Sequence, residues 1–188
     1  MKLVWGITGA GDLMPETFAV MEEIAEKYRP EITVALSLAA QQVIKWYSLE
    51  DRLGRIATRI CIEKDANTPF LAGPLQAGRY ALLFVAPVTA NTTAKIAHGI
   101  ADSLISNCVA QANKGRVPTF LLPVDQHPGK TTTTLPDGSP LDLYIRPVDV
   151  ENVTKVRQMN GITILSSPAE FKEVIGKFEK NSYIQENM

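Results

Sequence analysis

A near-continuous apolar segment, Ala81 to Ala86, most constrains how this chain folds. Such a run suits a strand that is covered on both faces, as in a parallel sheet. Pro87 is expected to stop the strand, since proline has no N–H for a strand ladder. The small and polar residues 88–93 would then follow the carboxyl end of a buried strand, which is where ligands bind in open α/β sheets.

Apolar residues recur every four positions after this segment, which predicts one amphipathic helix with a broad apolar face. The recurring residues are Ile96, Ile100, Leu104, Cys108 and Ala112. The chain therefore contains a strand, a polar turn and a helix in succession, and this unit is expected to form the centre of the fold.

Strands and helices alternate from residue 2 to about residue 123. Further strands are expected at 2–8, 31–36, 59–62 and 117–123, with helices after the first two. This alternation predicts an α/β protein with a doubly wound, mostly parallel sheet, a three-layer arrangement of the Rossmann or flavodoxin type. A chain of 188 residues is expected to form one domain over residues 1–188.

The later part of the chain is less regular. Residues 68–78 suggest a loop, and 124–160 an irregular segment rich in Pro, Gly and Thr, with a hairpin or edge strand at 141–146. A last strand at 162–165 precedes a helix that is expected to begin with Ser167 as N-cap and Glu170 completing a capping box. The domain thus divides into a core of about 1–123, the irregular segment, and a C-terminal strand and helix at about 161–180.

Three polar sites follow predicted strands. Gly9-Ala10-Gly11 lies between a strand and a helix, where unpaired backbone N–H groups can hold a phosphate. Met14 stands where a dinucleotide fingerprint needs its third glycine, so a plain tight turn is the alternative. Ser37 follows the second strand as a helix N-cap or as a phosphate ligand. Together with residues 89–93 these sites should gather at one edge of the sheet and form a ligand site.

Several classes of function are disfavoured. Charges are almost balanced, 19 basic against 20 acidic residues, and no basic stripe predicts a nucleic-acid partner. No apolar run approaches the roughly 18 residues of a membrane span, so a cytoplasmic protein without membrane contact is expected. Cys61 and Cys108 lie apart in apolar sequence and are expected as buried thiols rather than metal ligands. Gly129-Lys130-Thr131 lacks the first glycine of a P-loop, because residue 124 is valine.

Residues 6–12 (GITGAGD), Ser37 and residues 86–107 (APVTANTTAKIAHGIADSLISN) together resemble the homo-oligomeric flavin-containing cysteine decarboxylase family. That family includes phosphopantothenoylcysteine and lantibiotic-peptide decarboxylases, flavin prenyltransferases and archaeal flavoproteins of the dihydromethanopterin-reductase type. The resemblance covers roughly residues 1–123. It is most specific at 87–92 (PVTANT), which is similar to the family's Pro-Ala-Ser-Ala-Asn-Thr segment.

The resemblance implies an FMN cofactor and names its contacts. The phosphate would be held by the first glycine turn and Ser37, and the ring and ribityl chain by the segment after the central strand. The implied residues are Gly9, Ala10, Gly11, Ser37, Pro87, Thr89, Ala90, Asn91 and Thr92. The resemblance also implies a homo-oligomer, a trimer or a trimer-based dodecamer, with flavin at subunit contacts.

The sequence departs from the family's decarboxylases and prenyltransferases. The catalytic histidine expected fourteen positions before Pro87 is Gly73, which cannot transfer a proton. Residues 123–126 read Pro-Val-Asp-Gln, which is neither the decarboxylases' Pro-x-Met-Asn clamp nor the prenyltransferases' Arg-Glu pair. Prenyltransferases usually carry a small residue where this chain has Asn91. Both activities are therefore alternatives that the residues disfavour.

The archaeal redox members remain the nearest resemblance, since residues 4–11 (VWGITGAG) are similar to their opening. An FMN oxidoreductase is expected, with electrons arriving from ferredoxin or a similar donor and leaving to a pterin-like acceptor. A non-catalytic flavin electron carrier is a further alternative. No catalytic residue is assigned. His98 is interpreted as a packing or helix-terminal residue, His127 as a solvated loop residue, and Trp46 as a core or interface aromatic that can also stack on a ligand.

Overall fold

The computed structural model describes residues 1–186, with side chains described as far as residue 180. Six parallel strands form one sheet in the order β3-β2-β1-β4-β5-β8. Their bounds are β1 (Lys2–Ile7), β2 (Glu31–Leu36), β3 (Arg59–Ile62), β4 (Leu82–Val88), β5 (Thr119–Pro123) and β8 (Ile162–Ile164). The predicted doubly wound parallel sheet is confirmed.

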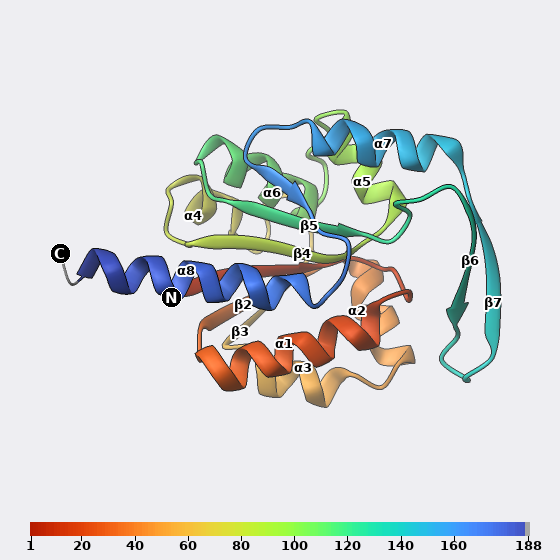
Figure 1. Ribbon diagram of the computed structural model, residues 1–188, viewed down its shortest axis with the longest axis horizontal. Helices are drawn as coiled ribbons and strands as arrows, with labels where there is room; N and C mark the ends of the chain where they lie inside the picture. The colour runs from red at the N-terminus through yellow and green to blue at the C-terminus, as the bar shows by residue number, and fades with distance from the viewer. Residues whose placement is uncertain (187–188) are drawn as a thin grey trace.

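Helices cover both faces of the sheet and complete the expected three layers (Figure 1). One layer holds α1 (Met14–Tyr28), α2 (Leu38–Trp46), α3 (Glu50–Ile56) and α8 (Glu170–Glu186). The other holds α4 (Ala72–Gln76), α5 (Ala90–Ala97), α6 (Leu104–Lys114) and α7 (Pro147–Arg157). None of the helices within residues 1–186 is long and apolar enough to cross a membrane.

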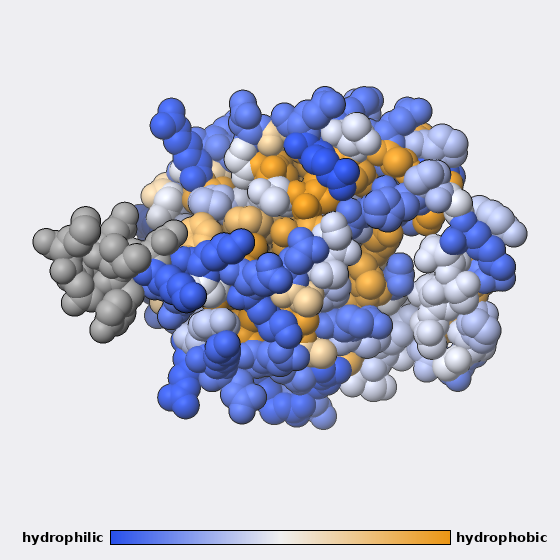
Figure 2. Space-filling model, in the orientation of Figure 1, coloured by the Kyte–Doolittle hydropathy of each residue, from blue (hydrophilic) through white to orange (hydrophobic). Residues whose placement is uncertain are grey.

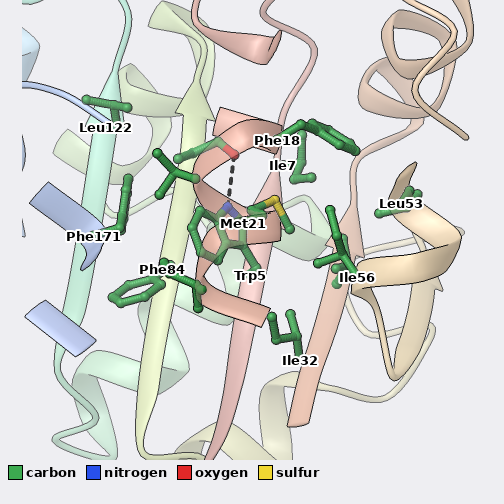
Figure 3. Packing of buried hydrophobic residues seen from close by; sticks show 14 of the residues in the cluster. Trp5, Ile7, Phe18, Met21, Ile32, Leu53, Ile56, Phe84, Leu122 and Phe171 are labelled. Atoms are coloured by element: carbon green, nitrogen blue, oxygen red, sulfur yellow. Dashed lines mark hydrogen bonds between the residues drawn. The ribbon is translucent and has the colours of Figure 1, made fainter. Parts of the chain in front are cut away.

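The central strand β4 contributes to two cores because its side chains alternate between the faces of the sheet. Phe84 packs on the side of α1 and α8, whereas Val85 packs on the side of α6. Around Phe84 the rings of Trp5 and Phe171 lie with centroids 5.1 and 4.8 Å away (Figure 3). The indole N–H of Trp5 donates to the Ala86 carbonyl at 3.2 Å, so this buried polar atom has a partner.

Strand β4 extends two residues beyond its expected end at Ala86, because Pro87 lies within the strand and does not stop it. Proline supplies no N–H, and the pairing of β4 with β5 shifts register between Val85 and Val88. The Pro87 carbonyl still accepts two hydrogen bonds from Thr8, from the backbone N–H at 3.2 Å and the hydroxyl at 2.9 Å. These bonds hold the end of β4 against the end of β1.

The single helix expected after β4 is wrong: α5 and α6 are separate, joined by residues 98–103. Gly99 adopts a left-handed φ of 70°, a conformation that ends a helix and favours glycine. Ser103 then caps α6, exchanging hydrogen bonds with Ser106 in a capping box. Ile100 falls on the four-residue period by coincidence and is 48% exposed.

The region after β3 is more ordered than the sequence indicated. The expected loop at 68–78 contains the short helix α4. The irregular segment 124–160 instead forms β6 (Gly129–Thr134), β7 (Pro140–Ile145) and helix α7. Strands β6 and β7 make an antiparallel hairpin of their own, which settles the hairpin-or-edge alternative for 141–146. The hairpin stands off from the three layers at the right of Figure 1.

The last helix begins later than predicted, at Glu170, because residues 167–169 form a turn with shorter-range hydrogen bonds. The predicted capping box is wrong, because the Glu170 N–H donates to the Ser167 carbonyl at 3.3 Å and not to its hydroxyl. The Glu170 carboxylate instead accepts from the backbone N–H of Ser166 at 3.0 Å and from the Ser167 hydroxyl at 3.4 Å.

Candidate functional site

The order of the strands reverses between β1 and β4. From β1 the chain winds outward to β2 and β3, and from β4 it winds the other way to β5 and β8. The loops after these two strands diverge at this switch point, so the carboxyl edge of the sheet opens there. The predicted polar sites after the first and central strands therefore share one edge.

A cavity of about 350 Å³ lies at this switch point, between the sheet edge and the β6–β7 hairpin. Its inner wall comes from the turn after β1, the end of α2 and the start of α5, and its outer wall from the hairpin. The lining residues are Gly9, Ala10, Gly11, Asp12, Val43, Trp46, Tyr47, Thr89, Ala90, Val124, Asp125, Thr131, Thr133, Leu135, Pro136, Leu141 and Leu143. A hollow between hairpin and body is visible in Figure 2.

The glycine turn offers unused backbone donors to this cavity. Within residues 1–186, the N–H groups of Gly9, Ala10 and Gly11 donate no hydrogen bond. Gly9 packs closely on α2: a Cβ added there would lie 2.5 Å from the Ala39 Cβ. The turn therefore needs glycine for its close approach to α2, and it presents the amides that anions bind at helix starts.

Thr89 joins the central strand to α5. It is the N-cap residue, and its hydroxyl accepts from the Thr92 N–H at 3.2 Å. Its own backbone N–H donates to the Thr8 hydroxyl at 2.8 Å. The buried Thr92 hydroxyl also accepts from Thr89, at 3.1 Å. This network fixes the start of α5 relative to the turn after β1.

Ser37 caps α2 as predicted, with its hydroxyl accepting from the Ala40 N–H at 3.0 Å. The next amide, that of Leu38, donates to the carboxylate of Glu63 at 3.1 Å. The other Glu63 oxygen accepts from the Leu104 N–H at the start of α6, at 2.8 Å. One carboxylate thus caps two helices from opposite layers of the fold, at the edge formed by β3.

The structure brings five of the nine predicted site residues into the lining of the cavity: Gly9, Ala10, Gly11, Thr89 and Ala90. Ser37, Pro87, Asn91 and Thr92 are not among the lining residues. Of the other three residues singled out, Trp46 lines the cavity and is 60% exposed, whereas the two histidines do not line it. His98 caps the end of α5, with its Nε2 3.5 Å from the Lys155 amine. Gly73, where decarboxylases have histidine, also lies outside the lining.

Sequence reasoning missed the outer wall of the cavity and two of its three titratable groups, Tyr47 and Asp125. The wall is built from alternate residues of the hairpin, Thr131 and Thr133 on β6 and Leu141 and Leu143 on β7. That alternation was the available signal, but without the pairing partner it resembles an ordinary irregular segment. Asp12 ends the motif at residues 6–12, whereas Tyr47 and Asp125 were given no role in a site.

Two of these titratable groups connect the body to the hairpin. The Tyr47 hydroxyl donates to the Thr134 carbonyl at 2.7 Å. Burial, together with the charges of Asp12 and Glu16, raises the pKa of Tyr47. Burial also raises the pKa of Asp12, and the Glu16 charge adds to this, although the Leu13 amide and the Thr133 hydroxyl donate to its carboxylate and oppose the shift.

Asp125 follows β5 and is half-buried in the cavity wall. Burial raises the pKa of its carboxyl, and the charges of Asp149 and Asp12 add to the shift. Arg146 opposes it, but that guanidinium already forms two hydrogen bonds, of 2.7 and 2.8 Å, to the carboxylate of Asp149. The cavity is therefore lined by two carboxyl groups and, within the described residues, by no cationic side chain.

A doubly wound sheet with a free glycine turn and a ligand-sized cavity at its switch point defines an α/β protein of the cofactor-binding class. A comparison with known families identifies the family within this class. The family model described as Flavoprotein matches residues 1–188, and the chain belongs to that family. This confirms the resemblance on which the expected flavin rests.

Relatives and solved structures place the chain more narrowly. It is 48% identical over 94% of its length to an uncharacterised protein of Methanocaldococcus jannaschii, 95% of which is covered. It is 38% identical over 89% of its length to dihydromethanopterin reductase (acceptor) of the same organism, 72% of which is covered. The structure of Burkholderia xenovorans DmrB in complex with FMN, described as a cubic protein cage for redox transfer, matches with a TM-score of 0.80 at 30% identity, covering 98% of this chain and 97% of that one.

Proposed function

We propose that the cavity at the switch point holds FMN and that the chain is an FMN-dependent oxidoreductase. The observation that carries this proposal is the set of free amides at Gly9, Ala10 and Gly11, three residues that line a cavity with aromatic and apolar side chains. Amides at a helix start suit a phosphate, and flat aromatic walls suit a flavin ring. The likeness to a DmrB structure with bound FMN supports the same assignment.

The residues present fit this cofactor in distinct roles. The amides of residues 9–11 line the cavity and would hold the phosphate, with the hydroxyl of Ser37 outside the lining at the start of α2. Thr89 and Ala90 line the cavity at the start of α5 and would contact the ribityl chain and ring, with Pro87, Asn91 and Thr92 beside them in the chain. Trp46 and Tyr47 supply aromatic surface beside them. Bound flavin supplies the electron chemistry, and the protein holds it and excludes competing reactions.

A relative supports the choice of electron acceptor, and an incomplete nicotinamide motif in the turn after β1 supports the choice of electron donor. Dihydromethanopterin reductase (acceptor) of M. jannaschii, 38% identical, supports a pterin-like acceptor. Met14 in place of a third glycine leaves the nicotinamide fingerprint incomplete, which favours ferredoxin or a similar reduced protein as the electron donor. Gly73 in place of a histidine argues against a decarboxylase.

Assembly and location are part of the same proposal. The chain forms a homo-oligomer of its single domain, a trimer or a larger assembly of trimers, and acts in the cytoplasm. Exposed aromatic side chains outside the cavity lining support association: Tyr144 on the hairpin is 77% and Phe70 before α4 is 70% exposed. The description of DmrB as a cubic cage supports assembly as well.

An absorption spectrum and a stopped-flow comparison of donors test the function. We expect protein saturated with FMN to be yellow and, without oxygen, to be bleached rapidly by reduced ferredoxin and slowly by NADH or NADPH. The bleached protein should then reduce a 7,8-dihydropterin. Protein that remains colourless in excess FMN would refute the cofactor, and fast bleaching by a nicotinamide would refute the donor.

A further inference from the structure

Three titratable side chains line the cavity, and their hydrogen bonds distinguish them. Asp12 accepts from the Leu13 amide and the Thr133 hydroxyl, and Tyr47 donates its hydroxyl proton to the Thr134 carbonyl. Asp125 differs, because within residues 1–186 its carboxyl forms no hydrogen bond or ion pair. It is the acid group in this wall that remains available to a ligand.

The surroundings of Asp125 keep it available. The positive charge of Arg146 acts on Asp125 and lowers its pKa. The Arg146 guanidinium, however, donates two hydrogen bonds, of 2.7 and 2.8 Å, to the buried carboxylate of Asp149. The charged groups that act on Asp125 are thus Asp149 and Arg146 at the start of α7 and Asp12 after β1. Burial raises the pKa of Asp125, and the charges of Asp149 and Asp12 add to the shift, so this carboxyl holds its proton to higher pH than an exposed aspartate does.

We propose that Asp125 is the catalytic residue that gives the proton to the electron acceptor. This inference rests on the proposed function. It narrows the acceptor class to heterocycles that are reduced at a C=N bond, as 7,8-dihydropterins are, because such a reduction needs a proton at nitrogen as well as electrons at carbon.

The step balances with the reduced flavin as the named reductant. The carbon of the acceptor's C=N bond takes a hydride equivalent, two electrons and one proton, and the flavin is oxidised. The nitrogen takes the carboxyl proton of Asp125, so the π bond is replaced by new C–H and N–H bonds. Asp125 is left as a carboxylate and regains its proton from water through the open mouth of the cavity.

The variant Asp125→Asn tests the assignment, with Asp51→Asn as matched control. Asp51 is exposed on α3, outside the cavity lining, and loses the same charge. Each protein is loaded with FMN, reduced without oxygen, and mixed with 7,8-dihydrofolate or with ferricyanide, an acceptor that takes electrons without a proton. We expect Asp125→Asn to slow the dihydrofolate reaction by about 100-fold or more and to change the ferricyanide rate less than twofold.

The pH profile and a measurement on the flavin-free protein complete the test. The wild-type dihydrofolate rate should fall as pH rises through the pKa of Asp125, since the donor form is lost, and the variant should lack that fall. A ¹³C carboxyl titration of the apoprotein should show one aspartate, absent in Asp125→Asn, with its pKa above the usual range.

Four results would overturn the proposal: an unchanged dihydrofolate rate in Asp125→Asn, equal losses with both acceptors, an ordinary pKa for Asp125, or wild-type protein that reduces ferricyanide but not dihydrofolate. Failure of the proposed function is distinct, because a protein that binds no FMN would reduce neither acceptor.

Discussion

The side chain of Thr8 accepts a hydrogen bond from the backbone N–H of Thr89 at 2.8 Å and donates one to the Pro87 carbonyl at 2.9 Å. Thr8 directly follows the first strand and is 1% exposed, while Thr89 is the N-cap of the helix after the central strand. One hydroxyl therefore sets the distance between the two loops that form the inner wall of the cavity.

Replacing Thr8 by valine should disrupt both the wall and the fold. Valine has nearly the same shape but leaves the Thr89 N–H without its partner, which costs about 1–3 kcal/mol of unfolding free energy. Urea unfolding measures this loss, and a fluorescence titration should show weaker FMN binding. Thr8→Ser keeps the hydroxyl and should retain most of both; equal losses in the two variants would contradict the role of this bond.

Gly9→Ala should weaken FMN binding at least about tenfold, a change of about 1.4 kcal/mol in binding free energy. The added methyl group would meet the Ala39 Cβ, so the turn and α2 must move apart. Gly54→Ala is the matched control, because nothing lies within 4 Å of its new methyl group. Isothermal titration with FMN measures both variants, and similar affinities would show that the close approach at Gly9 does not shape the site.

Glu63→Gln should lower stability without changing FMN binding. The glutamine loses the charge that favours two helix starts, and its NH₂ group cannot accept from the second amide. We expect a loss of about 1–2 kcal/mol in unfolding free energy, as for a helix cap. Chemical unfolding measures this change. Glu50→Gln, an exposed change in the first turn of α3, is the comparison, and equal effects would refute the double cap.

Stability should fall in acid partly through Asp149. Its hydrogen bonds with Arg146 hold the pKa of this carboxyl below its usual range in the folded protein. A depressed folded pKa means that the stabilisation is present above the unfolded pKa, near 4, and is lost as pH falls through the folded value. Unfolding curves from pH 7 to pH 2 should therefore converge for wild type and Asp149→Asn. A constant gap between them would show that the pair does not titrate in this way.

The strands of the sheet were predictable because each carries a strong local signal. Strand β2 has the predicted bounds, 31–36, and the apolar run of β4 reflects its two buried faces. The break after α5 was obscured, since Ile100 continues the four-residue period through an exposed connection. The residues that mark the break are Gly99, which ends α5, and Ser103, which caps α6. Each affects only a few neighbouring residues, so neither interrupts the four-residue spacing of apolar side chains.

The site was predictable only on its inner side, where the glycine turn and Thr89 follow strands of known direction. Tyr47 and Asp125 reach the cavity through tertiary packing, which no local pattern records. The hairpin was missed for a related reason. Its strands pair with each other and not with the main sheet, so the alternation of β6 has no buried face from which to infer its register.

The outer wall of the cavity is a two-stranded ribbon, and an isolated ribbon of this size is marginally stable in water. The hydrogen bond from the Tyr47 hydroxyl to the Thr134 carbonyl joins this ribbon to the body of the protein and stabilises it. Whatever occupies the cavity is in contact with that ribbon as well, so occupancy and backbone order are thermodynamically linked. A ligand bound in the cavity is therefore expected to make the hairpin more rigid, and part of its binding free energy would be used in ordering the hairpin.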